Sequence, residues 1–149
     1  MTSTNETDRD RALQELLDRA AITDLLSQRG RLGDEIRYDD VRDVFADDVV
    51  FVSHDGVVRA RGVDAVRTML GGLTEKYAAF QHVISNTLIE LDGDRAKVRS
   101  NIVATHILKD DPSKAWVVKG SYHDEAVRTP DGWRLSRCQP HRVWEGTIG

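Results

Sequence analysis

The sequence predicts an α+β domain in which a curved, mostly antiparallel sheet wraps over a long N-terminal helix, with two further helices beside it. Helical spacing of apolar residues is confined to the first half of the chain. Runs rich in β-branched residues fill the second half, where the turns Asp92-Gly93-Asp94 and Pro130-Asp131-Gly132 separate them. Such a sheet forms a cone around the helix, and the interior of the cone is the natural place for a ligand.

The first helix is predicted from about Asp10 to Leu32, and Gly30 and Gly33 mark its end. Its apolar residues recur at steps of three and four, which is typical of an amphipathic helix with one buried stripe. They are Leu13, Leu16, Leu17, Ala20, Ala21, Leu25 and Leu26. Residues 1–9 are polar, and we expect them to form a disordered tail ahead of a single domain over residues 10–149.

Shorter elements follow in the next part of the chain. A second helix is predicted over Tyr38–Phe45, a strand over Asp48–Ser53 and its hairpin partner over Val57–Ala60. A third helix begins at Gly62 and keeps its apolar spacing as far as Tyr77.

A long hairpin over Gln81–His106 is the organising element of the predicted sheet. We favour a register that pairs Leu91 with Arg95, because it groups apolar residues, whereas a two-residue loop mixes apolar with polar residues on both faces. The favoured register gives His82, Ile84, Asn86 and Leu88 one face. His106 then lies diagonally from His82, at roughly 7 Å between Cβ atoms. We therefore expect two imidazoles on one wall of a pocket, where Asn86 would orient a substrate oxygen.

The last two strands are predicted over Trp116–Arg128 and from Trp133 to about Trp144. Alternation along the first of them places Trp116, Tyr122 and Asp124 on the inner face. Tyr122 is then a candidate phenol donor, and Trp116 and Asp124 are candidate substrate-binding residues. A core position with a backbone hydrogen bond is the alternative for Tyr122.

Composition narrows the classes of partner. The formal net charge is -4 and no block of lysine and arginine occurs, so nucleic acid and anionic membranes are not expected partners. No apolar run approaches the ~20 residues of a membrane span, and the polar N-terminus lacks a signal sequence, so we expect a cytoplasmic protein. The single cysteine excludes an internal disulfide and a cysteine-rich metal site.

Four segments, in order and spacing, resemble one known family. They are DRAAITDLL, YDDVRDVFADDVVF, QHVISNTLIELDGDRAKV and GSYHDEAVRTPDGWRL. From about Asp10 to Glu145 the chain is similar to the SnoaL-like branch of the NTF2-like superfamily, whose fold is the cone described above. This branch includes scytalone dehydratase, bile-acid 7α-dehydratase and hexachlorocyclohexane dehydrochlorinase, which run eliminations without a cofactor. The resemblance therefore implies no cofactor and no metal, and a homo-oligomer, either a trimer or a dimer.

The resemblance also implies roles for individual residues. Asp34 takes the position of an aspartate that orients a histidine, and His82 takes the position of that histidine, which abstracts the substrate proton. His106 corresponds to a second polar residue of the pocket, and Arg142 to a functional arginine near the C-terminus. Several relatives carry a tyrosine in the helix end before the aspartate, where this sequence has Arg29, Gly30 and Gly33.

The chemistry of these side chains supports the same roles independently. A neutral imidazole accepts a proton near pH 7, and a carboxylate on its second nitrogen fixes the tautomer and stabilises the cation. An elimination also needs an acid, which His106, Tyr122 or an ordered water could supply. The hypothesis is a dehydratase-type lyase acting on a hydrophobic cyclic, polyketide- or steroid-like small molecule.

Three alternatives stay open at this point. An isomerase or cyclase could use the same dyad of Asp34 and His82, because its reaction also begins with proton abstraction. The domain could instead be a non-catalytic module that binds small molecules, since a fold does not imply its function. Two histidines and Asp34 also match the ligand count of a 2-His-1-carboxylate iron site.

Overall fold

The computed structural model describes residues 2–149, except for the side chains of residues 2 and 3. The helices are α1 (Thr2–Asp34), η1 (Tyr38–Asp40), α2 (Val41–Val44), α3 (Val63–Gly71) and η2 (Gly72–Glu75). The strands are β1 (Phe45–Val52), β2 (Val58–Arg61), β3 (Tyr77–Asp92), β4 (Arg95–Leu108), β5 (Ala115–Thr129), β6 (Gly132–Cys138) and β7 (Pro140–Ile148).

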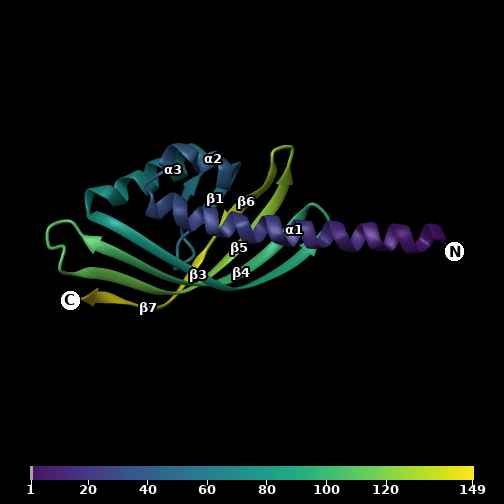
Figure 1. Cartoon of the computed structure of the whole chain (residues 1–149). Helices are drawn as coiled ribbons and strands as arrows, with labels where there is room; N and C mark the ends of the chain where they lie inside the picture. The colour runs from purple at the N-terminus through teal and green to yellow at the C-terminus, as the bar shows by residue number, and fades with distance from the viewer. Residues whose placement is uncertain (1) are drawn as a thin grey trace.

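One curved sheet carries the helices on one of its faces (Figure 1). The strand order is β2-β1-β6-β5-β4-β3, and β7 pairs with β5. All pairings are antiparallel except that of β1 with β6. The predicted α+β class, a sheet wrapped over a long N-terminal helix with two further helices, is confirmed.

The helix α1 differs from its prediction in its start and in its buried face. It begins at Thr2 rather than near Asp10, and its N-terminal part extends past the sheet (Figure 1). The predicted stripe is wrong over most of its length, because Leu13, Leu16 and Leu17 are 55–65% exposed and Ala20 and Ala21 are exposed as well. The buried face is instead formed by Asp18, Ile22, Leu25, Leu26, Arg29 and Leu32. Disorder of residues 1–9 in solution stays a prediction.

The central hairpin combines two registers. His82 pairs with Ala104 and Ile84 with Ile102, as predicted. Near the turn, however, Leu91 pairs with Ala96 and not with Arg95.

A β-bulge joins the two registers of this hairpin. Asn86 and Thr87 of β3 together face Ser100 of β4, and Asn86 has a positive φ of 54°. Inward-facing positions change from even to odd numbers across the bulge. Leu88, predicted to face inward, is therefore 69% exposed, and Ile89 packs against the core.

Two further boundaries differ from the prediction. The third helix ends at Gly71, where two consecutive glycines disfavour the helix, and Tyr77 already belongs to β3. The predicted strand from Trp133 to Trp144 is divided into β6 and β7, which pair with opposite halves of β5. The division falls at Gln139, because Pro140 has no N–H to donate to the sheet.

The core lies between the helices and the concave face of the sheet. Its fully buried side chains include Ile22, Leu26, Val49, Val66 and Leu135. Among the helices that the structure describes, none combines the length and apolar composition needed to cross a bilayer.

Candidate active site

Asp34, at the end of α1, lies against His82 on β3. The Nδ1 of His82 is 2.7 Å from the Oδ1 of Asp34. The backbone N–H of His82 also donates to this carboxylate, at 2.9 Å to Oδ1 and 3.2 Å to Oδ2. Because a carboxylate only accepts, Nδ1 carries a proton, and in the neutral imidazole Nε2 then keeps its lone pair. The contact therefore fixes the tautomer that a general base requires.

Two glycines of α1 make room for this imidazole. A Cβ on Gly33 would lie 3.1 Å from Cε1 of His82, and a Cβ on Gly30 would lie 3.6 Å from the Cβ of His82. Both glycines lie within the helix rather than beyond its end. Their missing side chains let β3 approach α1 closely enough for the Asp34 contact.

His106 is buried among aromatic rings. Its ring centroid lies 4.9 Å from that of Tyr77, 5.0 Å from that of Trp116 and 5.8 Å from that of His82. Burial and the nearby His82 lower the pKa of His106, so its imidazole is neutral at pH 7. Nδ1 lies 3.2 Å from the carbonyl oxygen of Trp116 and donates to it. The Nε2 of His106 is therefore left as a hydrogen-bond acceptor.

Tyr122 lies on a buried ion pair. The guanidinium carbon of Arg29 is 3.7 Å from the centroid of the Tyr122 ring, and Nη1 of Arg29 is 2.5 Å from Oδ2 of Asp124. Asp124 is 3% exposed and also accepts the backbone N–H of Gln139 at 3.3 Å. Burial raises the pKa of the Tyr122 phenol, against the effect of the Arg29 charge. The phenol therefore keeps its proton at neutral pH and can donate.

This arrangement differs from the expectation about Asp124. Asp124, predicted to bind substrate, does not line the cavity that contains His82, because its carboxylate is held by Arg29. Arg29 is 9% exposed, and its guanidinium lies over the face of the Tyr122 ring.

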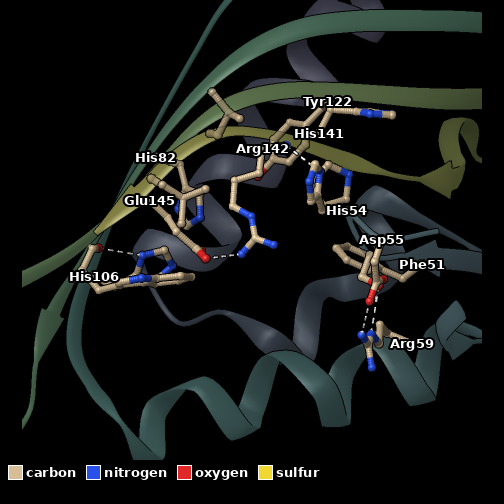
Figure 2. A pocket seen from close by; sticks show the side chains of 16 residues that line it. Phe51, His54, Asp55, Arg59, His82, His106, Tyr122, His141, Arg142 and Glu145 are labelled. Atoms are coloured by element: carbon tan, nitrogen blue, oxygen red, sulfur yellow. Dashed lines mark hydrogen bonds and ion pairs between the residues drawn. The ribbon is translucent and has the colours of Figure 1, made fainter. Parts of the chain in front are cut away.

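Arg142 and Glu145 of β7 both point into the cavity and toward each other, and their side chains form an ion pair (Figure 2). Strict alternation would place these two residues on opposite faces. A bulge at Val143 prevents this, because Lys119 pairs with Trp144 whereas Gly120 pairs with Arg142. Gly120 permits the close approach, since a Cβ there would lie 2.0 Å from the carbonyl oxygen of His141.

Asn86 lies outside the site. It is exposed at the bulge of β3 and lines neither of the cavities next to His82. The expectation that it orients a substrate oxygen depended on unbroken alternation from His82, which the bulge ends.

The cavity in front of His82 has a volume of about 400 Å³ and is open on one side. His106, Trp116 and Tyr122 line it, as the sequence predicts. Asp34 lines a separate groove on the outside of the molecule, together with Ser27 and Gln81. The dyad thus reaches both the cavity and the outer surface.

Several lining residues were not predicted from the sequence: Phe51, His54, Asp55, Arg59, His141 and Glu145. His54, Asp55 and Arg59 come from the β1–β2 hairpin, which reads as a surface turn. The backbone N–H of Arg142 donates to Nδ1 of His54 at 2.9 Å and so joins this hairpin to β7. No local pattern signals that contact, because it depends on the order of strands in the sheet.

The possible iron ligands are not arranged around a common point. Within the part of the chain that the structure describes, no three His, Cys, Asp or Glu side chains are placed to hold a metal ion. The Asp34 carboxylate is instead directed at Nδ1 and the backbone N–H of His82.

Comparison with known proteins identifies the family of the chain. A family model described as a SnoaL-like domain matches residues 14–139. The chain belongs to the SnoaL-like domain family. An uncharacterized protein of Mycobacterium tuberculosis is 27% identical over 130 residues, which covers 85% of this chain and 86% of that protein.

Solved structures of this SnoaL-like fold superpose closely. A protein from Kribbella flavida has a TM-score of 0.82 and 27% identity, covering 89% of this chain and 95% of its own. A structure from Novosphingobium aromaticivorans, provisionally assigned as a scytalone dehydratase, has a TM-score of 0.81 and 21% identity, covering 100% and 93%. The hexachlorocyclohexane dehydrochlorinase LinA-type3 from Novosphingobium barchaimii has a TM-score of 0.81 and 18% identity, covering 93% and 94%. At these last two identities the likeness shows the fold alone.

Proposed function

We propose that the protein is a cofactor-independent lyase of the dehydratase type. The observation that carries the proposal is the 2.7 Å contact of Asp34 with Nδ1 of His82, which leaves Nε2 of His82 as the free basic atom beside a cavity. An imidazole held in this way is a general base near pH 7 without a metal.

The proposed reaction is a β-elimination from a hydroxy ketone. Nε2 of His82 takes the proton from the carbon next to the carbonyl, and Asp34 stabilises the imidazolium that forms. The electron pair of the broken C–H bond becomes the new C=C bond. The hydroxyl group on the next carbon leaves with its bonding electrons, takes up one proton and departs as water.

Tyr122 fits the role of the acid better than His106 does. Tyr122 lines the cavity, and its hydroxyl keeps its proton and has no hydrogen bond to the described residues. The neutral His106 already donates its one N–H to the Trp116 carbonyl, so its Nε2 can only accept. We therefore assign proton donation to Tyr122 and acceptance of a substrate hydroxyl to His106.

The lining of the cavity supports a hydrophobic cyclic substrate of the polyketide or steroid type. Phe51, Ile102, Val118 and Trp116 give apolar and aromatic walls. Polar and charged side chains, among them Arg142 and His106, complete the lining and can bind the oxygen atoms of such a substrate. Apolar surface combined with placed polar groups is typical of sites for small organic ligands.

The experiment is a screen of cyclic β-hydroxy ketones, followed by the rise in absorbance that accompanies a conjugated enone. We expect turnover by the wild-type protein and none by His82→Ala, with an unchanged circular dichroism spectrum. Near-normal turnover by that variant would rule the mechanism out.

The same screen in D₂O separates the alternatives. Deuterium entering the substrate beside the carbonyl, without loss of water, would indicate an isomerase or cyclase, which shares the first step. Binding with neither exchange nor elimination would indicate a non-catalytic binding module.

A further inference from the structure

Two compartments meet at His82. The outer one is the cavity of about 400 Å³ described above, and a second, deeper compartment of about 250 Å³ lies between the helices and the sheet. Phe51, His82 and Tyr122 line both, so these three side chains form the boundary between them.

The two linings differ in chemistry. The outer compartment contains charged and imidazole side chains, among them Asp55, Arg59, Arg142 and Glu145. The deep compartment is lined mainly by leucine, methionine and phenylalanine side chains from α1, β1, α3, η2 and β3. These are Leu32, Phe45, Met69, Leu70, Leu73 and Phe80.

Apart from His82 at the boundary, the polar residues of the deep compartment offer no free charge. Arg29 is paired with Asp124 at 2.5 Å and covered by the ring of Tyr122. Burial raises the pKa of the Tyr38 phenol, which is therefore neutral. Apolar cavities of about 150 Å³ stay dry and bind a benzene ring, so one of about 250 Å³ has room for a longer alkyl group or a second ring.

We propose that the deep compartment is a subsite for an apolar substituent of the ligand. The ligand is then an amphipathic molecule, with its oxygen-bearing ring in the outer compartment and an alkyl chain or apolar ring beyond Phe51. Placing the reacting carbon next to His82 rests on the proposed function, whereas the subsite itself does not.

The test uses 4-alkylphenols from methyl to hexyl, titrated calorimetrically into the full chain. Burying a methylene contributes about 0.8 kcal/mol, so we expect Kd to fall about fourfold per added carbon until the compartment is filled. In Leu70→Trp the larger indole occupies part of the compartment, so 4-methylphenol should bind as before while the gain per added carbon becomes smaller. Met69→Trp gives a second variant if Leu70→Trp does not fold.

The matched control is Ala65→Trp, at an exposed position of the same helix. It should keep the wild-type slope, that is, the fall of Kd with each added carbon. The subsite would be overturned by a wild-type series in which Kd does not change with chain length or in which no binding is seen. An unchanged dependence of Kd on chain length in both Leu70→Trp and Met69→Trp would also overturn it. His82→Ala should keep the slope although it is inactive. A normal slope without turnover of any hydroxy ketone would contradict the proposed function alone, and turnover without a slope would contradict the subsite alone.

Discussion

Asp34 performs two tasks with one carboxylate, because it accepts both the backbone N–H and the Nδ1–H of His82. In Asp34→Asn the amide can still accept from the backbone, but its NH₂ group favours the opposite tautomer of the imidazole. We expect kcat/KM to fall about 10²–10⁴-fold, the usual contribution of general base catalysis, with little change in KM.

The control for this prediction is Asp24→Asn, an exposed aspartate on the same helix. Steady-state kinetics of the two variants should differ by at least the lower limit of that range. Equal activities would show that Asp34 only connects the helix to the strand.

His106 gives the stability of the protein a pH dependence. Burial and the neighbouring His82 lower the pKa of His106 in the folded state, although the Asp34 charge acts in the opposite direction. The unfolded chain therefore binds more protons between the folded pKa and about 6.5. Stability contributed in this way is fully present above pH 6.5 and is lost as the pH falls through that window.

Urea unfolding at pH 7.5 and pH 5.5 measures this loss. In His106→Phe, which fits the aromatic surroundings without titrating, we expect a smaller loss of unfolding free energy. Some loss should persist, because burial and the adjacent His141 also lower the pKa of His123. An equal loss in variant and wild type would contradict this prediction.

The residues of the site differ in how far the sequence could place them. Asp34 and His82 are brought together as predicted, although 48 positions apart in the chain, because the family resemblance supplies their joint position. The role of Asp124 could not be assigned from the sequence, because its partner Arg29 lies on another element. The alternation of side chains along a strand indicates which face a residue lies on, but not which residue it contacts. The catalytic roles of all these residues stay predictions.

At the scale of elements, Asp18 attaches the middle of α1 to the far end of the sheet. It accepts two hydrogen bonds from Arg128 at 2.8 Å and one from Nε1 of Trp133 at 3.1 Å. Asp18→Ala would leave the buried indole N–H of Trp133 and two N–H groups of Arg128 without this acceptor, while Arg128 keeps its ion pair with Asp94. We expect a loss of about 2–4 kcal/mol in unfolding free energy, measured by urea denaturation.

Asp8→Ala is the matched control on the same helix. Its ion pair with Arg11 is exposed, with 59% and 74% of the side chains accessible, so the change should stay within about 0.5 kcal/mol. Comparable losses in the two variants would mean that the Asp18 contacts do not stabilise the fold.

Bulges explain most of what the sequence could not predict about the strands. The existence of each long strand follows from β-branched residues and turn sequences, and the register follows from apolar pairing as far as Ile84. An extra residue at Asn86 and another at Val143 then change which side chains face inward. Neither position carries a glycine, although asparagine, the residue at the first bulge, adopts a positive φ more readily than most other residues.

At the scale of the whole molecule, helices followed by strands are enough to predict the class and the cone. The parallel pairing of β1 with β6 is not predictable from local pattern, because these strands lie more than 80 residues apart. That pairing brings the β1–β2 hairpin to the cavity, which is why His54 and Arg59 were missed.

The outer face of the sheet is where the predicted homo-oligomer can be tested. Val83, Val103, Lys119 and Trp144 lie in one row across four strands. Val83 is 53% exposed, Val103 37% and Trp144 46%. We expect light scattering to give a multiple of 16.7 kDa for the wild type and a smaller assembly for Val83→Asp. A monomeric wild type would contradict the prediction.

The bulge at Asn86 also has a consequence for the evolution of chain length in this family. The bulge adds one extra residue to β3 relative to β4. Losing a residue there would make the pairing regular and leave both His82 and Ile89 on the inner face of the sheet. The neighbouring β4 pairs with β5 without interruption, and the same deletion in that strand would turn half of its side chains to the other face. Gaps between relatives are therefore expected inside β3, between the half of the strand that carries His82 and the half that packs the core.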